Sequence, residues 1–264
     1  MSTPLTAGNT RVKEARKLSR RPARSERRLF LADGPRAVEG ALALTGCAVE
    51  VFATPTAGEG YAALRERAAA AGVAWTTVED RALASLSDSV TPAGVVAVCR
   101  FLDQAPAEVV RDADLVAICA DVRDPGNAGT VVRTADAVGA DGVLLAGHSV
   151  DAYNPKTVRA SVGSLFHLPV ALASSVPDAV TVAQDAGLVV VAADGGGEVD
   201  LFEADDLLRG RVAWVFGNEA WGLPEETAAL AQHRVRIPIP GRAESLNLAT
   251  AAAVCLYATA RARR

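Results

Sequence analysis

The stretch that decides the fold runs from Leu115-Val-Ala-Ile-Cys-Ala120 into Asp121-Val-Arg-Asp-Pro-Gly-Asn-Ala-Gly-Thr-Val-Val-Arg133. A continuous apolar run of this length is typical of a parallel strand covered on both faces. A Pro-Gly turn follows it, and then a helical pattern over about 127–139 with Asn127 suited to the N-cap. The stretch therefore predicts a strand, a tight turn and a helix, which is the repeating unit of an α/β domain.

The same alternation continues toward the C-terminus. Short β-branched runs predict strands at 142–145, 188–192, 212–216 and 234–237, with helices between them and a final helix over about 245–261. We expect a parallel sheet with helices on both faces. Ligands of such sheets bind beyond the carboxyl ends of the strands, so we expect the chemistry in the loops after Ala120, Ala192, Phe216 and Ile237.

The first hundred residues also alternate between helical and strand patterns. Helices are predicted at about 10–20, 35–45 and 60–71, and strands at 49–52, 73–77 and 94–99. An acidic stretch with Pro106 then interrupts the pattern, and we expect a linker at about 103–113. The predicted domains are a smaller α/β domain over residues 1–105 and a larger one over residues 113–264.

Composition narrows the class of protein. A chain of 264 residues that is 50% hydrophobic and 22% charged can bury a substantial core, which excludes intrinsic disorder as its general state. The overall net charge is −4, but residues 1–36 carry +7 and the remainder carries −11. This asymmetry favours a polyanion, a membrane surface or an acidic protein as the partner of the N-terminal segment.

Other features point to an ordinary cytoplasmic protein. The four cysteines show no C-x-x-C spacing and lie mostly in apolar runs, so we expect buried free thiols. The three histidines have no metal-ligand spacing, and we expect no zinc or other metal site. The N-terminus lacks the apolar core of a signal peptide, and the longest apolar run is shorter than the ~20 residues that span a bilayer.

Two further loops carry candidate chemistry. Gly217-Asn-Glu-Ala-Trp-Gly-Leu-Pro224 follows a strand and places a carboxylate, Glu219, beside two glycines and apolar residues that suit the wall of a ligand site. Ile237-Pro-Ile-Pro-Gly241 leads through Ser245 and Asn247 into the final helix. Structural interpretations stay open: Arg133 in a surface ion pair, Glu219 bonding backbone amides in its turn, and Ser245 as an N-cap.

Taken together and in this order, the three loops closely resemble the three motifs of the SpoU (TrmH-like) RNA 2′-O-methyltransferases over roughly residues 113–260. The resemblance implies a SPOUT fold, a parallel sheet with a deep trefoil knot. Phe30-Leu-Ala-Asp-Gly-Pro-Arg36 and Thr91-Pro-Ala-Gly-Val-Val-Ala-Val98 are similar to the family's N-terminal RNA-binding extension, a ribosomal-protein L30e-like domain. Ala220 departs from the glycine that many relatives have there.

The resemblance also assigns roles. It implies that S-adenosylmethionine binds at Gly217, Ile237 and Leu246, and that a methyl group passes to a ribose 2′-hydroxyl. Arg133 would position that hydroxyl and stabilise charge, because a guanidinium with a pKa above ~12 is a reluctant base. The other implied catalytic residues, which orient the reactants through hydrogen bonds, are Asn127, Glu219, Ser245 and Asn247. Relatives are homodimers with sites near the subunit interface, so a homodimer is expected.

The basic N-terminus then becomes an expected RNA contact. Its members are Arg11, Lys13, Arg16, Lys17, Arg20, Arg21, Arg24, Arg27 and Arg28. An N-terminal domain of about a hundred residues is more typical of relatives that act on 23S rRNA than of those that act on tRNA. The alternatives are a tRNA 2′-O-methyltransferase, a non-catalytic RNA-binding or ribosome-assembly protein and, more distantly, a nicotinamide-dependent oxidoreductase, for which the chain has no G-x-G-x-x-G.

Overall fold

The computed structural model describes residues 3–264 and divides into two compact units. The N-terminal unit comprises the chain up to Leu102 together with Asp151–His167, and the C-terminal unit comprises Asp103–Val150 and Leu168–Arg264. The chain therefore passes three times from one unit to the other. The segment expected as a linker lies in the C-terminal unit and contains a helix, α7 (Pro106–Val110), whose Val109 and Val110 are buried.

The N-terminal unit is built on a four-stranded sheet in the order β1-β4-β2-β3. Strand β4 pairs antiparallel with both neighbours, and β2 pairs parallel with β3. The strands are β1 (Leu29–Asp33), β2 (Ala48–Ala53), β3 (Ala74–Thr77) and β4 (Val95–Arg100). The sequence did not predict β1, whereas the other three strands lie within one residue of their predicted bounds.

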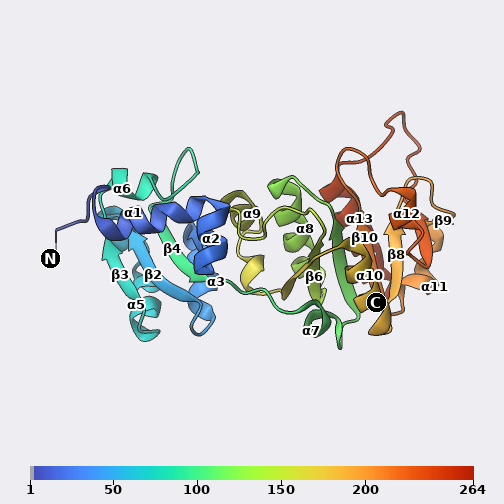
Figure 1. Cartoon of the computed structure of the whole chain (residues 1–264), viewed down its shortest axis with the longest axis horizontal. Helices are drawn as coiled ribbons and strands as arrows, with labels where there is room; N and C mark the ends of the chain where they lie inside the picture. The colour runs from blue at the N-terminus through green and yellow to red at the C-terminus, as the bar shows by residue number, and fades with distance from the viewer. Residues whose placement is uncertain (1–2) are drawn as a thin grey trace. The chain divides into compact units, whose positions relative to one another are not determined.

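Short helices surround this sheet (Figure 1). They are α1 (Thr10–Arg16), α2 (Arg21–Arg27), α3 (Pro35–Ala43), α4 (Pro55–Gly60), α5 (Ala62–Ala70), α6 (Asp80–Ala84) and α9 (Pro155–Ala160). The helix predicted over 10–20 ends early: α1 is followed by a 3₁₀ turn, and α2 begins with Pro22 in its first turn. Proline is favoured there because its missing N–H is not needed at a helix start.

Aromatic side chains tie Asp151–His167 into the N-terminal unit. The ring of Tyr153 stacks on Phe101 at 3.9 Å between centroids and lies 4.7 Å from Phe30. The Tyr153 hydroxyl accepts a hydrogen bond from the backbone N–H of Leu102 at 2.7 Å. Phe166 stacks against Phe30, so this inserted segment supplies part of the core on which the first hundred residues fold.

The C-terminal unit contains a seven-stranded, all-parallel sheet in the order β7-β6-β5-β10-β8-β11-β9. Its strands are β5 (Leu115–Ala120), β6 (Gly142–Ala146), β7 (Val170–Ala173), β8 (Val189–Ala193), β9 (Val199–Asp200), β10 (Val212–Phe216) and β11 (His233–Arg236). Strands β5 and β10 have the predicted bounds, and every residue of both is buried.

Helices cover both faces of this sheet, as predicted (Figure 1). One face packs Ile118, Leu144 and Val190 against α7 and α10 (Val176–Asp185). On the other face α8 (Pro125–Ala137) and α13 (Leu248–Ala262) pack together against β5 and β10, and the Trp214 indole donates to the Thr259 hydroxyl at 2.9 Å. Short helices α11 (Asp205–Leu208) and α12 (Glu225–Ala228) complete the unit.

The expectations for the cysteines, for membrane-spanning segments and for the knot can now be compared with the structure. All four cysteines are buried and free, and burial raises the pKa of the Cys119 and Cys255 thiols to about 12. Within residues 3–264 no helix is both long and apolar enough to cross a bilayer. The trefoil knot implied by the resemblance stays a prediction.

Candidate functional site

Three loops meet at one edge of the large sheet. They follow β5, β10 and β11, and because all strands are parallel, their carboxyl ends lie on the same side. A cavity of about 270 Å³ opens there between the loops after β8, β10 and β11 and the start of α13. The site therefore lies where the strand pattern predicts it.

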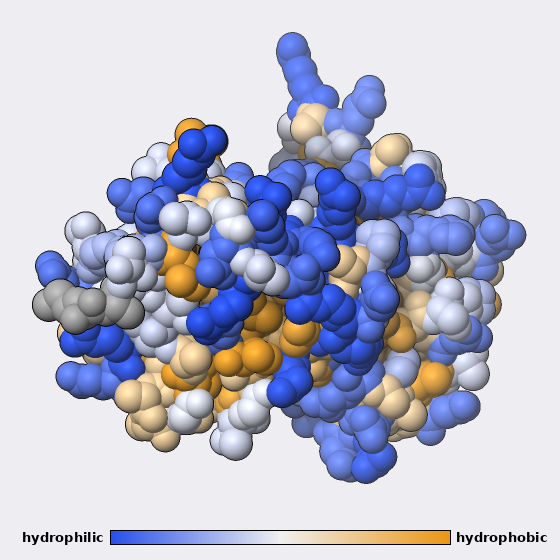
Figure 2. All heavy atoms as spheres, turned by 60° about the vertical axis from the view of Figure 1, so that its left-hand side comes forward, coloured by the Kyte–Doolittle hydropathy of each residue, from blue (hydrophilic) through white to orange (hydrophobic). Residues whose placement is uncertain are grey.

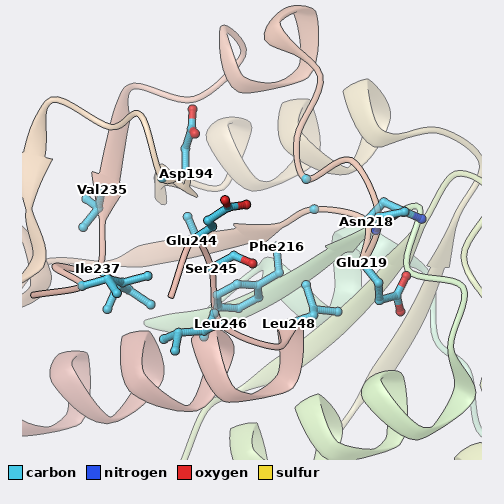
Figure 3. A pocket seen from close by; sticks show the side chains of 17 residues that line it. Asp194, Phe216, Asn218, Glu219, Val235, Ile237, Glu244, Ser245, Leu246 and Leu248 are labelled. Carbon is cyan, nitrogen blue, oxygen red and sulfur yellow. Dashed lines mark hydrogen bonds between the residues drawn. The ribbon is translucent and has the colours of Figure 1, made fainter. Parts of the chain in front are cut away.

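The cavity combines apolar walls with three carboxylates, those of Asp194, Glu219 and Glu244. Phe216, Ile237 and Leu246 lie along one side, and Asp194 and Glu244 lie above them (Figure 3). All three residues predicted to hold a cofactor, Gly217, Ile237 and Leu246, line the cavity. Sequence reasoning did not select Asp194 or Glu244; the only available signal was that Asp194 follows a predicted strand.

Gly217 has no room for a side chain. A Cβ at this position would lie 2.4 Å from the carbonyl carbon and oxygen of Gly222 and 2.6 Å from the backbone nitrogen of Leu223. The loop that crowds it is closed by two backbone hydrogen bonds between Asn218 and Gly222, at 2.8 and 2.9 Å. Gly222 itself adopts a φ of +68°, a conformation that favours glycine. Both glycines are thus required by the backbone.

Glu219 accepts hydrogen bonds from the loop after β5. The backbone N–H of Arg123 donates to Oε2 at 3.1 Å, and the backbone N–H of Asp124 donates to Oε1 at 2.9 Å. The Asn127 side-chain amide donates to the same Oε1 at 3.2 Å. Burial favours a higher pKa, but these donors and the backbone N–H of Glu219 itself outweigh it, so the net pKa of Glu219 is lowered.

The amide of Asn127 links this loop to the start of α13. Its Oδ1 accepts from Nδ2 of Asn247 at 3.1 Å, while Oδ1 of Asn247 accepts from the backbone N–H groups of Ala249 and Thr250. Asn247 is therefore the N-cap of α13, and the alternative of Ser245 as N-cap is wrong. Ser245 instead lines the cavity. The chain Glu219–Asn127–Asn247 joins all three loops.

The N-cap expected at Asn127 is also wrong. Asp124 occupies that position and accepts from the backbone N–H of Asn127 at 2.8 Å, which leaves the Asn127 side chain free to bridge. Asn218 belongs to the second motif, but the sequence assigned it no role in the site. It is buried, donates to the carbonyl of Asp121 at 2.7 Å and accepts from the N–H of Ala220. Ala220 has no positive φ and fits this turn.

Arg133 lies apart from the cavity. It is exposed on α8, about two turns after Asn127, and it is not among the residues that line the cavity. Throughout the described chain, residues 3–264, no hydrogen bond or ion pair engages its guanidinium. The ion-pair interpretation of Arg133 is therefore wrong for this structure, and the guanidinium is free to act on a ligand.

The basic N-terminal residues divide into two groups. Arg24 is 2% exposed and bonds Asp151 through Nε at 2.9 Å and Nη2 at 2.6 Å, and the carbonyls of Leu18 and Ser19 through Nη1. Its placement among RNA-contacting residues is therefore corrected. Four more of these cations already have a partner within the protein. Arg11 forms an ion pair with Glu50, Lys17 and Arg27 form ion pairs with Glu14, and the Arg28 guanidinium lies over the Phe101 ring.

The remaining cations, Lys13, Arg16, Arg20 and Arg21, are exposed and unpaired within residues 3–264. The view that brings the N-terminal unit forward is covered mainly by hydrophilic side chains, with hydrophobic ones between them (Figure 2).

No candidate metal site is found in the described part of the chain. Residues 3–264 contain no cluster of three His, Cys, Asp or Glu side chains placed to hold an ion.

The sequence matches two known families and several characterised relatives. The model of the SpoU rRNA methylase family matches residues 114–257, and that of the MRM3-like substrate-binding domain matches residues 9–97. The 23S rRNA (guanosine(2553)-2′-O)-methyltransferase RlmP of Bacillus subtilis is 30% identical over 260 residues, 96% of each chain. The 23S rRNA (uridine(2479)-2′-O)-methyltransferase of Streptomyces viridochromogenes is 42% identical over 144 residues, 53% of this chain and 50% of that protein.

Solved structures agree over the whole chain. The SpoU methyltransferase AviRb from Streptomyces viridochromogenes, in complex with the cofactor AdoMet, superposes with a TM-score of 0.83 at 31% identity, covering 97% of this chain and 99% of that one. An AdoMet-bound rRNA methyltransferase from Sinorhizobium meliloti gives 0.82 at 33% identity, with 96% and 95% covered. With its two domains matched in order and its three motif loops joined by hydrogen bonds, this chain belongs to the SpoU rRNA methylase family.

Proposed function

We propose that the protein transfers a methyl group from S-adenosylmethionine to a ribose 2′-hydroxyl of ribosomal RNA, with 23S rRNA the first candidate. The carrying observation is that hydrogen bonds join Glu219, Asn127 and Asn247 in series and so hold the three motif loops together, beside a cavity that the second and third loops line. Relatives named as 23S rRNA 2′-O-methyltransferases and structures solved with AdoMet support the proposal.

The cavity residues suit this cofactor. A flat adenine ring fits an apolar slot such as that between Ile237 and Leu246, and a backbone without a Cβ at Gly217 permits close approach. Asp194 and Glu244 provide acceptors for hydroxyl or ammonium groups. S-adenosylmethionine, when bound, supplies the methyl group and a sulfonium charge that disappears on transfer.

Residues of the three motifs orient the acceptor. A 2′-hydroxyl is a poor nucleophile at neutral pH, so the site must hold its oxygen in line and favour loss of its proton. Arg133 positions this oxygen and offsets the negative charge that develops on it. Asn127, Glu219 and Asn247 hold the loops in register, and Ser245 offers a hydroxyl at the cavity wall.

The N-terminal unit is proposed to hold RNA through the four unpaired cations, Lys13, Arg16, Arg20 and Arg21. We further propose a cytoplasmic homodimer. Tyr257 on α13 is 55% exposed, and Arg133 on the neighbouring α8 is unpaired, so these packed helices offer a surface for a second copy.

Substitution of Arg133 tests the reaction. Arg133→Ala should retain S-adenosylmethionine binding in calorimetry, because Arg133 does not line the cavity, but reduce methyl transfer by at least about 100-fold. Transfer is measured with radiolabelled cofactor and rRNA from cells that lack the gene, and ribose-methylation mapping then identifies the nucleotide.

Arg111→Ala is the matched control, since Arg111 is also exposed in the C-terminal unit, outside all three loops. Undiminished transfer by Arg133→Ala would remove this residue from the mechanism. Absence of cofactor binding by the unaltered protein would instead favour a non-catalytic RNA-binding role.

A further inference from the structure

Trp221 and Arg123 form an exposed pair next in the chain to residues of the site, since Ala220 and Gly222, on either side of Trp221, line the cavity. The Trp221 side chain is 53% exposed, and the Arg123 guanidinium carbon lies over its ring, 5.2 Å from the centroid. Arg123 is exposed too, and within the described part of the chain its guanidinium has no carboxylate partner. The pair is therefore an aromatic ring with a cation over one face, a cation–π arrangement that leaves the rest of the ring exposed.

Both members are mounted on rigid backbone. Trp221 is held in the loop that two Asn218–Gly222 hydrogen bonds close, between buried Asn218 and Leu223, which packs on the core. The backbone of Arg123 is fixed by its N–H bond to Glu219. A tryptophan carried by a loop held in this way needs little backbone ordering when a ligand covers its ring.

The position of the pair relates it to the proposed chemistry. Glu219, immediately before Ala220 and Trp221, also holds the Asn127 amide, so the pair is joined to the network that fixes the loops around the cavity. Neither side chain lines the cavity itself, and the proposed roles of the motif residues leave both unused. A ribose that enters this site brings its base with it, one glycosidic bond away.

We infer that Trp221, supported by Arg123, is a stacking platform for an unpaired base of the RNA substrate, at or beside the methylated nucleotide. The inference rests on the proposed function. Every base has a π-face that stacks on an aromatic ring, and arginine adds attraction both to that face and to the adjoining phosphate. The enzyme then requires its target in a loop or bulge, because a base inside a duplex has no free face.

Intrinsic fluorescence provides a direct test. The chain has three tryptophans, of which Trp214 is fully buried, so in a Trp75→Phe background Trp221 is the accessible one. Titration with a short single-stranded oligoribonucleotide of mixed sequence should quench this emission, and the same strand in a duplex should quench it much less. RNA binding seen by fluorescence anisotropy of a labelled strand, with no change in Trp221 emission, would overturn the inference.

Kinetics of the full-length protein supply the second measurement. Trp221→Ala should raise KM for rRNA by roughly 5- to 150-fold, the range expected for loss of one stacked base, with little change in cofactor affinity. Trp221→Phe should recover most of the loss, because it keeps an aromatic face. Phe202→Ala is the matched control, since Phe202 is another exposed aromatic of the same unit, 66% exposed and outside the site loops.

The outcomes separate this inference from the proposed function. Unchanged KM in Trp221→Ala, with normal methyl transfer, overturns the stacking role and leaves the methyltransferase assignment intact. A Trp221→Ala protein whose size by light scattering differs from that of the unaltered protein also overturns it, because Trp221 would then face a second copy. Absence of transfer by the unaltered protein on any rRNA contradicts the proposed function itself.

Discussion

At the scale of single residues, Glu219 shows how a side chain far along the chain completes a helix start. Two backbone N–H groups at the beginning of α8 need acceptors, and this carboxylate, 95 and 96 positions away, supplies them. A negative charge there also complements the helix dipole. These donors lower the pKa of Glu219, which favours its ionised form.

Gly217 yields a prediction at this scale. Gly217→Ala should abolish S-adenosylmethionine binding in calorimetry, because the new methyl group would overlap the carbonyl of Gly222 and force the Asn218–Gly222 loop out of the cavity wall. Gly195→Ala is a matched control, since Gly195 lines the same cavity and a Cβ there meets nothing within 4 Å. Equal affinities for the two variants would show that the loop adapts and that crowding at Gly217 is unimportant.

Residue identities were more predictable than residue roles. The motifs selected Asn127 and Asn247, and the structure brings their amides to 3.1 Å. The cap positions were wrong because Asp124 and Asn127 are both good N-cap residues, as are Ser245 and Asn247. A choice between them depends on which amide has a partner in another loop, and no local pattern contains that information.

At the scale of elements, the start of α13 combines a structural and a functional task in one side chain. Asn247→Asp should keep the cap, since either oxygen of an aspartate accepts from the helix N–H groups, but it removes the donor to Asn127. We expect near-native stability in urea unfolding and a clear loss of methyl transfer. Asn247→Ala should lose both, with an unfolding free energy lower by about 1 kcal/mol.

If Asn247→Asp transfers methyl groups as fast as the unaltered enzyme, the bridge between loops has no catalytic consequence. Asn247→Asp and Asn247→Ala both lose the hydrogen bond to Asn127, but only Asn247→Ala also loses the N-cap. A comparison of the two therefore separates the effect of the cap from that of the bridge.

Elements were predictable where burial is uniform. Strands β5 and β10 lie in the middle of the sheet and have long apolar runs, so their bounds were read correctly. Strand β9 has two residues and β7 has four, and both lie at sheet edges, where a short strand suffices and leaves little pattern in the sequence. Strand β1 was not predicted because its five residues, Leu29–Asp33, lie between the helices predicted at 10–20 and 35–45, and so short a run has no pattern of its own.

At the scale of the whole molecule, the charge asymmetry has both a structural and a functional part. Arg24→Met should lower the unfolding free energy by about 3–5 kcal/mol, because it leaves Asp151, 10% exposed, as a buried carboxylate without its partner. Arg27→Met, at an exposed position with a 3.7 Å ion pair to the Glu14 carboxylate and a 3.0 Å hydrogen bond to the Glu14 carbonyl, should change stability by only about 1 kcal/mol. Urea unfolding measures both; similar losses would mean that Asp151 gains water in the variant.

The proposed role of the basic N-terminal residues in RNA binding is tested by the salt dependence of RNA affinity. Replacing Lys13, Arg16, Arg20 and Arg21 with glutamine should weaken RNA binding and reduce the slope of log Kd against log salt concentration by up to about 3, at about 0.7 for each lost contact to single-stranded RNA. Thermal stability should be unchanged because these side chains are unpaired. Glutamine at Arg11 and Arg27, which already have carboxylate partners, is the control. An unaltered slope would place the RNA elsewhere.

Whole-molecule organisation was only partly predictable. The two α/β units follow from strand patterns, but nothing in the local sequence of Asp151–His167 indicates that it leaves the larger unit. Its Tyr153 and Phe166 read as ordinary core residues, and only their stacking on Phe30 and Phe101 assigns them to the other unit.

This triple passage of the chain restricts how such an enzyme can be altered by recombination. A chimera that exchanges only residues 1–102 for those of a relative would pair a foreign sheet with the native Tyr153, Phe166 and Asp151, whose partners it no longer supplies. A new RNA specificity cannot simply be grafted at the N-terminus. Residues 1–102 must be exchanged together with Asp151–His167, the segment within the methylase sequence that folds with them.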